Sequence, residues 1–316
     1  MRPLIFTLML CGCLSIAQEE MVEEAVQVSQ TADACRAAAE AGDAAAQYEL
    51  ARCYFTGAGV TPSVSKALEW LRKAANQGYA EAQCNLAECY ADGIGVEKSA
   101  YKAAVCWILA AQQNHPEAQY RLGVAHLRGE GVRQSDKLGL MWLNRTAEQN
   151  HTEAMFHLGF CRLKGTGGKA DAAEAVRLFQ RAAEQGHAQA SYWLGFCMLE
   201  GAGTKKNPEA AVAHLLRAAD GLCDAAALPL ARCYERGLGV EVDVNAAFDW
   251  YWRAAEAGLV EAQYKLGLFL EEGKGCKKNR DKAVKWYKKA AEQQHPEAQK
   301  RLEQLRAEKE VKRTES

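Results

Sequence analysis

A strict 36-residue repeat constrains the fold of this 316-residue chain more than any other feature. A Gly-x-Gly pair recurs seven times without an insertion, at Gly57/Gly59, Gly93/Gly95, Gly129/Gly131, Gly165/Gly167, Gly201/Gly203, Gly237/Gly239 and Gly273/Gly275. A leucine seven residues before each pair keeps the same spacing, at Leu50, Leu86, Leu122, Leu158, Leu194, Leu230 and Leu266, and once more at Leu302. Periodicity of this length indicates stacked supersecondary units rather than one globular core.

Each repeat has the pattern of two helices. In the first repeat we expect one helix over about residues 44–55 and a second over about residues 65–77, because apolar residues fall at helical spacing in both. Gly57 supplies the left-handed turn that ends the first helix. A small residue follows each leucine and lets a neighbouring helix approach closely: Ala51, Ala87, Gly123, Gly159, Gly195, Ala231 and Gly267. One helix pair cannot bury its apolar face alone, so the pattern predicts an all-α solenoid.

The register divides the chain into repeats and caps. Seven repeats occupy residues 43–78, 79–114, 115–150, 151–186, 187–222, 223–258 and 259–294, after a half-repeat cap at 31–42 and before a charged capping helix at 295–309 and a charged tail at 310–316. Pro229 falls inside the first helix of the sixth repeat, where it removes a backbone hydrogen bond and predicts a kink.

Two segments of the seventh repeat carry a family resemblance. Residues 262–267 (Ala-Gln-Tyr-Lys-Leu-Gly) and 282–293 (Lys-Ala-Val-Lys-Trp-Tyr-Lys-Lys-Ala-Ala-Glu-Gln) resemble Sel1-like repeats, relatives of the tetratricopeptide repeat with a longer inter-helix loop. The resemblance covers about residues 31–305. It implies a right-handed superhelical solenoid of helix pairs. It also implies a non-catalytic scaffold that binds a protein or peptide on its concave face.

The first 17 residues have the layout of a secretory signal peptide. A positive start at Met1-Arg2 precedes an apolar run at 4–14 and the small residues of Ser15-Ile16-Ala17, and a polar, acidic segment follows at 18–30. The layout predicts an exported protein, periplasmic or secreted. Two alternatives stay open: a lipoprotein box that would lipidate Cys13, and a buried N-terminal helix. The apolar run is too short to predict a transmembrane helix.

Charge and motifs argue against several functions. The net charge of −1 does not suit a general nucleic-acid binder. His115, His151, His187 and His295 recur at one repeat position, so we expect solvent-facing turn residues rather than metal ligands. No nucleophile elbow or phosphate loop is present, and we expect no cofactor. The family resemblance raises one alternative, a cysteine-rich Sel1-type enzyme acting on a β-lactam or cell-wall-like substrate.

Most of the cysteines follow the repeat. Five share one column that we expect in the core: Cys53, Cys89, Cys161, Cys197 and Cys233. Cys84 and Cys106 lie outside this column, at similar distances from the loop that joins their helices. They could form a disulfide in an exported chain or remain unpaired buried thiols, and the sequence leaves both open.

Two columns on the first helices give the candidate partner-binding residues. The positions two before and two after the leucine place Tyr120 with Val124, Phe156 with Phe160, and Tyr192 with Phe196, each pair on one helix face. We expect one aromatic strip, flanked by Arg52, Glu88 and Arg232. Alternatively, the column two before the leucine packs between repeats. The column two after it is charged in three repeats, so folding does not require apolar residues there.

The C-terminal stretch is basic. Residues 274–316 hold 14 basic and 7 acidic residues, an excess of seven positive charges. This stretch could contact an anionic surface, although interspersed acidic residues favour a solvated capping face.

Overall fold

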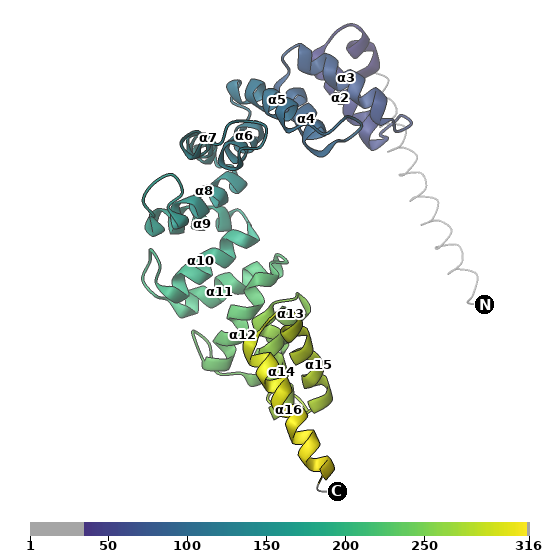
Figure 1. The fold of residues 1–316 in the computed structure, drawn as a ribbon. Coiled ribbons are helices and arrows are strands. Elements are labelled where there is room, and N and C mark those ends of the chain that lie inside the picture. The colour runs from purple at the N-terminus through teal and green to yellow at the C-terminus, as the bar shows by residue number, and fades with distance from the viewer. Residues whose placement is uncertain (1–34, 315–316) are drawn as a thin grey trace, which may run out of the picture. The chain divides into compact units, whose positions relative to one another are not determined.

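All regular structure in the described part of the chain is helical. The computed structural model describes residues 35–314 (Figure 1). The first helices of the repeats are α2 (Ala44–Thr56), α4 (Ala80–Asp92), α6 (Pro116–Arg128), α8 (Thr152–Lys164), α10 (Ala188–Glu200), α12 (Ala227–Arg236) and α14 (Val260–Glu272). The second helices are α3 (Val64–Asn76), α5 (Ala100–Gln112), α7 (Asp136–Glu148), α9 (Ala172–Glu184), α11 (Pro208–Asp220), α13 (Val244–Glu256) and α15 (Arg280–Glu292). A last helix, α16, spans Pro296–Thr314.

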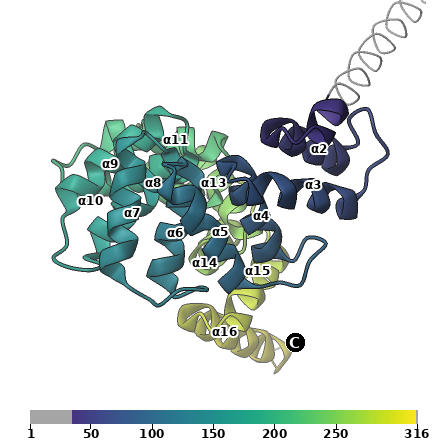
Figure 2. The ribbon, with the colours of Figure 1, turned by 90° about the horizontal axis from the view of Figure 1, so that it is seen from above.

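The helices pack in chain order within two compact units. Residues 35–151 belong to one unit and residues 152–314 to the other. Within each unit a first helix packs against its own second helix, as α10 does against α11 in Figure 1 and α8 against α9 in Figure 2. The expected all-α fold of consecutive helix pairs is confirmed.

Local chemistry sets the helix boundaries. Each second helix follows a Ser, Asp or Asn whose side chain accepts a backbone N–H of the first turn, as Ser63 Oγ does from Lys66 at 3.4 Å. First helices end at the first glycine of the Gly-x-Gly pair. Gly57 has a φ of 81° and donates its N–H to the Cys53 carbonyl at 2.8 Å. These caps explain why nearly every helix has the same length.

The repeated apolar columns form the core. The seven leucines of the repeated column, from Leu50 to Leu266, are each at most 6 % exposed. The small residue after each leucine leaves room for the paired second helix. A Cβ on Gly159 would lie 2.8 Å from Phe179 Cε1, and one on Gly267 would lie 2.4 Å from Tyr287 Cε1. Glycine in a first helix therefore accommodates a large ring on the second helix.

A buried glutamine column, which was not predicted from the sequence, joins successive repeats. Gln119 donates from Nε2 to the Ala111 carbonyl at 3.1 Å and accepts from Gln149 Nε2 at 2.7 Å. The same pair of bonds recurs at Gln47, Gln83 and Gln263. These bonds satisfy polar groups that would be costly to bury unpaired.

Pro229 does not kink a helix, so that prediction is wrong. A 3₁₀ helix at Asp224–Ala226 precedes α12, and Pro229 lies in the first turn of α12. Backbone N–H groups of a first turn have no intrahelical acceptor, so the missing N–H of proline removes nothing there. The α-helix of this repeat begins later instead.

Helices are found at both ends of the described residues. Residues 35–40 are helical, within the expected N-terminal half-repeat, and α16 extends past the expected end of the capping helix. The predicted signal peptide, the acidic segment and Cys13 lie outside the described residues. None of the helices within residues 35–314 is both long and apolar enough to cross a membrane.

A polar cluster joins the seventh repeat to α16. The Tyr287 hydroxyl donates to Glu271 Oε2 at 2.8 Å, and Arg301 Nε donates to the same oxygen at 3.0 Å. The hydrogen bond from Arg301 is the main reason that the pKa of Glu271 is lowered. The Glu271 carboxylate on α14 therefore stays charged and bridges α15 of the seventh repeat to α16.

Candidate interaction surface

The column two residues before each leucine packs between repeats. The Tyr120 ring stacks on His151 with centroids 5.1 Å apart, and Phe156 stacks on His187 at 4.6 Å. Tyr120 is only 9 % exposed. In each case the partner stands just before the next first helix. Of the two alternatives left open by the sequence, packing between repeats therefore holds for Tyr120 and Phe156.

The recurrent histidines are structural, and the expectation that they face solvent is wrong. His115 and His187 accept the backbone N–H three residues later through Nδ1, at 3.2 and 3.0 Å, and so cap α6 and α10. All four repeat-position histidines are half-buried. Burial lowers the pKa of His187. No group of three His, Cys, Asp or Glu within residues 35–314 is placed to hold a metal ion.

In the unit that begins at residue 152, the column two residues after each leucine is more accessible than the column two residues before it, and its aromatic rings form a cluster. Phe160 is half-buried and Phe196 is 37 % exposed. Both rings contact Trp193 edge-on, with centroid distances of 5.3 and 5.7 Å. Lys164 Nζ lies 4.3 Å above the Phe160 ring. We call Phe160, Trp193 and Phe196 the aromatic cluster.

Trp193 was not among the residues predicted from the sequence. It occupies the position directly before the leucine, where the other repeats have Glu49, Asn85, Arg121, His157, Pro229 and Lys265. A lone aromatic ring in a column that is otherwise mostly polar was the available signal. Tyr192, which was predicted for the strip, packs into the neighbouring apolar core and against Trp193.

A pocket adjoins the aromatic cluster. Phe196 on α10 and Arg232 on α12, both predicted, line the same pocket of about 360 Å³. Its apolar wall includes Leu199, Pro208, Pro229 and Leu238. Its charged lining consists of Lys206, Arg232 and Arg236 against Glu200. The pocket therefore offers apolar surface with a net positive rim.

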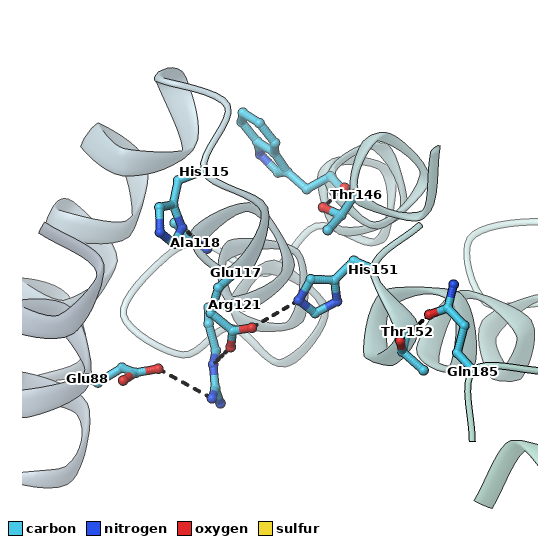
Figure 3. Close-up of polar contacts among 10 residues, drawn as sticks. Glu88, His115, Glu117, Ala118, Arg121, Thr146, His151, Thr152 and Gln185 are labelled. Atoms are coloured by element: carbon cyan, nitrogen blue, oxygen red, sulfur yellow. Dashed lines mark hydrogen bonds and ion pairs between the residues drawn. The ribbon is translucent and has the colours of Figure 1, made fainter. Parts of the chain in front are cut away.

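In the unit of residues 35–151 the predicted charged residues take part in ion pairs. Arg52 pairs with Glu49 at 3.0 Å on the exposed surface of α2. Glu88 faces Arg121 at 3.5 Å, as Figure 3 shows. Val124 is half-buried on α6.

The chain of ion pairs continues from Arg121 across the next repeat. Arg121 Nε lies 2.6 Å from Glu117, whose other oxygen lies 3.0 Å from His151 Nε2 (Figure 3). The hydrogen bond with His151 lowers the pKa of Glu117, whereas burial raises the pKa of Glu88. These contacts link side chains of three successive repeats.

Burial makes two of the described cysteines poor nucleophiles. All ten described cysteines are free, Cys84 and Cys106 among them, so the structure holds these two as thiols rather than as a disulfide. Burial raises the pKa of Cys84 to about 12 and that of Cys233 to about 11. Both thiols stay protonated at neutral pH, which does not favour nucleophilic chemistry.

Two serines have the Ser-x-x-Lys spacing of serine β-lactamases, and both cap helices. Ser63 Oγ accepts from the Lys66 N–H, and Ser99 Oγ accepts from the Lys102 N–H. The lysine ammonium groups lie over tyrosine rings, 5.5 Å from Tyr54 for Lys66 and 5.6 Å from a ring on α4 for Lys102. Neither serine has the geometry of an activated nucleophile.

The basic C-terminal stretch contains a groove between α15 and α16. Its volume is about 650 Å³. Val284, Leu302 and Leu305 line it together with Arg280, Asp281, Lys285, Lys288, Arg306 and Glu308. Arg280 also pairs with Glu308 across the groove. Acidic residues thus offset part of the positive charge, as a solvated capping face requires.

Comparison with known proteins identifies the repeat. The family model described as Sel1 repeat matches residues 44–79, 80–115, 116–151, 152–187, 188–221, 225–259 and 260–295. A search of curated proteins found no match.

Two solved structures are similar over most of the chain. A protective antigen of uropathogenic Escherichia coli strains, described as displaying an SLR fold, is 32% identical with a TM-score of 0.81, and the match covers 87% of this chain and 59% of that one. This chain therefore spans about three-fifths of the length of the E. coli protein. A Sel1 repeat protein from Oxalobacter formigenes is 29% identical with a TM-score of 0.69, covering 87% of this chain and 79% of that one. Because seven matched segments fill most of its length, the chain belongs to the Sel1 repeat family.

Proposed function

We propose that this protein is an exported, non-catalytic scaffold that binds a protein or peptide on the face formed by the first helices of its repeats. Sel1 repeat proteins are generally protein-interaction scaffolds. One observation carries the proposal. Two members of the aromatic cluster, Phe160 and Phe196, are partly exposed at positions where other repeats carry Arg52, Glu88 and Arg232, so the fold itself does not require aromatic rings there.

The pocket beside the cluster indicates the chemistry of the partner. Apolar side chains and three cations against one carboxylate suit a segment with an apolar anchor next to an acidic residue. Phe196 is the best-supported contact residue for this partner, since it belongs to the aromatic cluster and also lines the pocket.

The substitution Phe196→Ala tests this surface. Peptides selected from a displayed random library on the wild-type protein should bind Phe196→Ala at least about tenfold more weakly, because aromatic anchors commonly contribute about 2 kcal/mol or more. Isothermal titration calorimetry measures the affinity. Circular dichroism should show unchanged helicity and nearly unchanged melting, and Phe160→Ala combined with Phe196→Ala should abolish binding.

Met141→Ala is the matched control. Met141 is 48 % exposed on α7, a second helix, so its removal should leave affinity unchanged. Selected peptides that bind Phe196→Ala as tightly as the wild type would contradict the proposed surface. Turnover of nitrocefin by the purified protein would instead support the enzyme alternative.

Export is a separate part of the proposal, and it rests on the layout of residues 1–17. Mass spectrometry of protein from its native host should show a chain that begins at Gln18, or one that begins at a lipidated Cys13. An intact Met1 on protein recovered from the cytoplasm would contradict export.

A further inference from the structure

The Tyr287–Glu271–Arg301 cluster has an incomplete counterpart five repeats earlier. The equivalent positions hold Trp107, Ala91 and Arg121. The donor is therefore present in the second repeat and the guanidinium at the start of the third, whereas the carboxylate is replaced by a methyl group.

In the other repeats, the residue at the Tyr287 position predicts the residue at the Glu271 position. In the sixth repeat the Tyr251 hydroxyl donates to Glu235 at 2.5 Å, as Tyr287 does to Glu271. Where the second helix carries no donor, both positions are apolar, in the pairs Leu71 with Phe55, Leu143 with Leu127, Phe179 with Leu163 and Leu215 with Leu199. Trp107 therefore differs from Tyr251 and Tyr287: all three are hydrogen-bond donors at the same repeat position, but only Trp107 has no glutamate sixteen residues before it.

The structure shows a pocket at this position. Ala91, Trp107 and Arg121 line a pocket of about 520 Å³ in the unit of residues 35–151. Trp107 is only 9 % exposed, and its Nε1–H is buried without a hydrogen-bond partner. A buried donor without an acceptor costs about 1–3 kcal/mol, which an incoming acceptor would recover. Arg121 pairs with Glu117 through Nε at 2.6 Å, whereas its Nη2 has only a long contact to Glu88, at 3.5 Å.

We propose that this pocket binds an acidic side chain of a partner peptide, whose carboxylate takes the place that Glu271 occupies in the seventh repeat. Trp107 Nε1–H and the Arg121 guanidinium are its donors. Charge-assisted hydrogen bonds of this kind are stronger than neutral ones. The site rests on the proposed scaffold function and belongs to the unit of residues 35–151, whereas the aromatic cluster belongs to the other unit.

The other residues that line the pocket indicate the charge of the peptide residues on either side of the acidic one. Glu88, Asp92 and Glu130 outnumber Lys98 and Arg121 around the pocket. A carboxylate alone would be repelled by this excess, so the ligand must bring positive charge beside it. An acidic residue flanked by basic residues meets both requirements.

A nuclear magnetic resonance titration tests the site directly. The probe is acetyl-Lys-Glu-Lys-amide, its isosteric control is acetyl-Lys-Gln-Lys-amide, and Trp107→Phe assigns the indole N–H signal. We expect a saturable shift of the Trp107 signal with the first peptide, and at least about tenfold weaker binding of the second peptide and of the first peptide to Arg121→Gln.

Two substitutions of Ala91 give an independent measurement. Ala91→Glu should shift the Trp107 signal without any ligand, because it restores the carboxylate found in the seventh repeat. Ala91→Leu, the residue type of the third to fifth repeats, should leave this hydrogen bond unformed. Both should block the probe.

Several results would overturn the site: a Trp107 signal unmoved by the probe, equal binding of the two peptides, or undiminished binding to Ala91→Leu. Should Ala91→Glu fail to fold, the wild-type and Arg121→Gln titrations decide alone. They report on residues 35–151, whereas the Phe196 experiment reports on residues 152–314, so each proposal can fail separately.

Discussion

Leu158→Ala should lower the free energy of unfolding by about 2–5 kcal/mol, the range for truncating a buried leucine. Leu158 lies in α8 and is 2 % exposed. Gly159 beside it holds the Phe179 ring close to the helix, so the backbone is already in near contact with α9 and cannot easily collapse into the cavity. Urea unfolding followed by circular dichroism measures the change.

Leu109→Ala is the control for this substitution. Leu109 lies on α5 and is 45 % exposed, so the same truncation should change stability by no more than about 0.5 kcal/mol. If Leu158→Ala costs as little as this control, Leu158 does not occupy the core position that the 36-residue register assigns to it.

Gly203→Ala should cost about 2–5 kcal/mol, because overpacking and a left-handed backbone each disfavour a side chain there. Gly203 has a φ of 72°, and its Cβ would lie 2.1 Å from the Ala172 carbonyl oxygen. That oxygen belongs to the start of α9 in the preceding repeat. The second glycine of the pair therefore permits contact between repeats, which extends the role predicted from sequence.

Gly168→Ala provides the matched comparison in a loop of the same unit. No atom lies within 4 Å of a Cβ built on Gly168, and the residue is exposed. Its stability should stay within about 0.5 kcal/mol of the wild type in urea unfolding. Equal losses for the two glycine substitutions would mean that loop stiffness, and not contact between repeats, explains the effect.

Leu158→Ala and Gly203→Ala also test how the stacked repeats stabilise one another. In a stacked repeat protein each repeat contacts only its neighbours, so a defect in one contact weakens two adjacent repeats. The buried glutamines and the histidine caps act at the same junctions. Met155, Ser191 and Ala227 replace glutamine in the fourth to sixth repeats, so those junctions rely more on apolar and aromatic packing.

Part of the candidate surface could be predicted from sequence and part could not. Phe160 and Phe196 stood out because charged residues occupy their column elsewhere, and the structure shows them around one tryptophan. Tyr120 and Phe156 gave no such signal, since an apolar column is compatible with either a surface strip or a packing contact. Only the stacking on His151 and His187 decides between these two.

The sequence by itself determined the repeat, the helix pairs and the core columns, because helix caps and helical periodicity are local. The tertiary structure decided which residues meet across repeats. Gln119 meets Ala111, Phe160 meets Trp193, and Gly203 meets Ala172, so the number of residues between the two partners differs from one contact to the next. A periodic sequence shows which residues recur, but the tilt and spacing of stacked helices set the offset at which they touch.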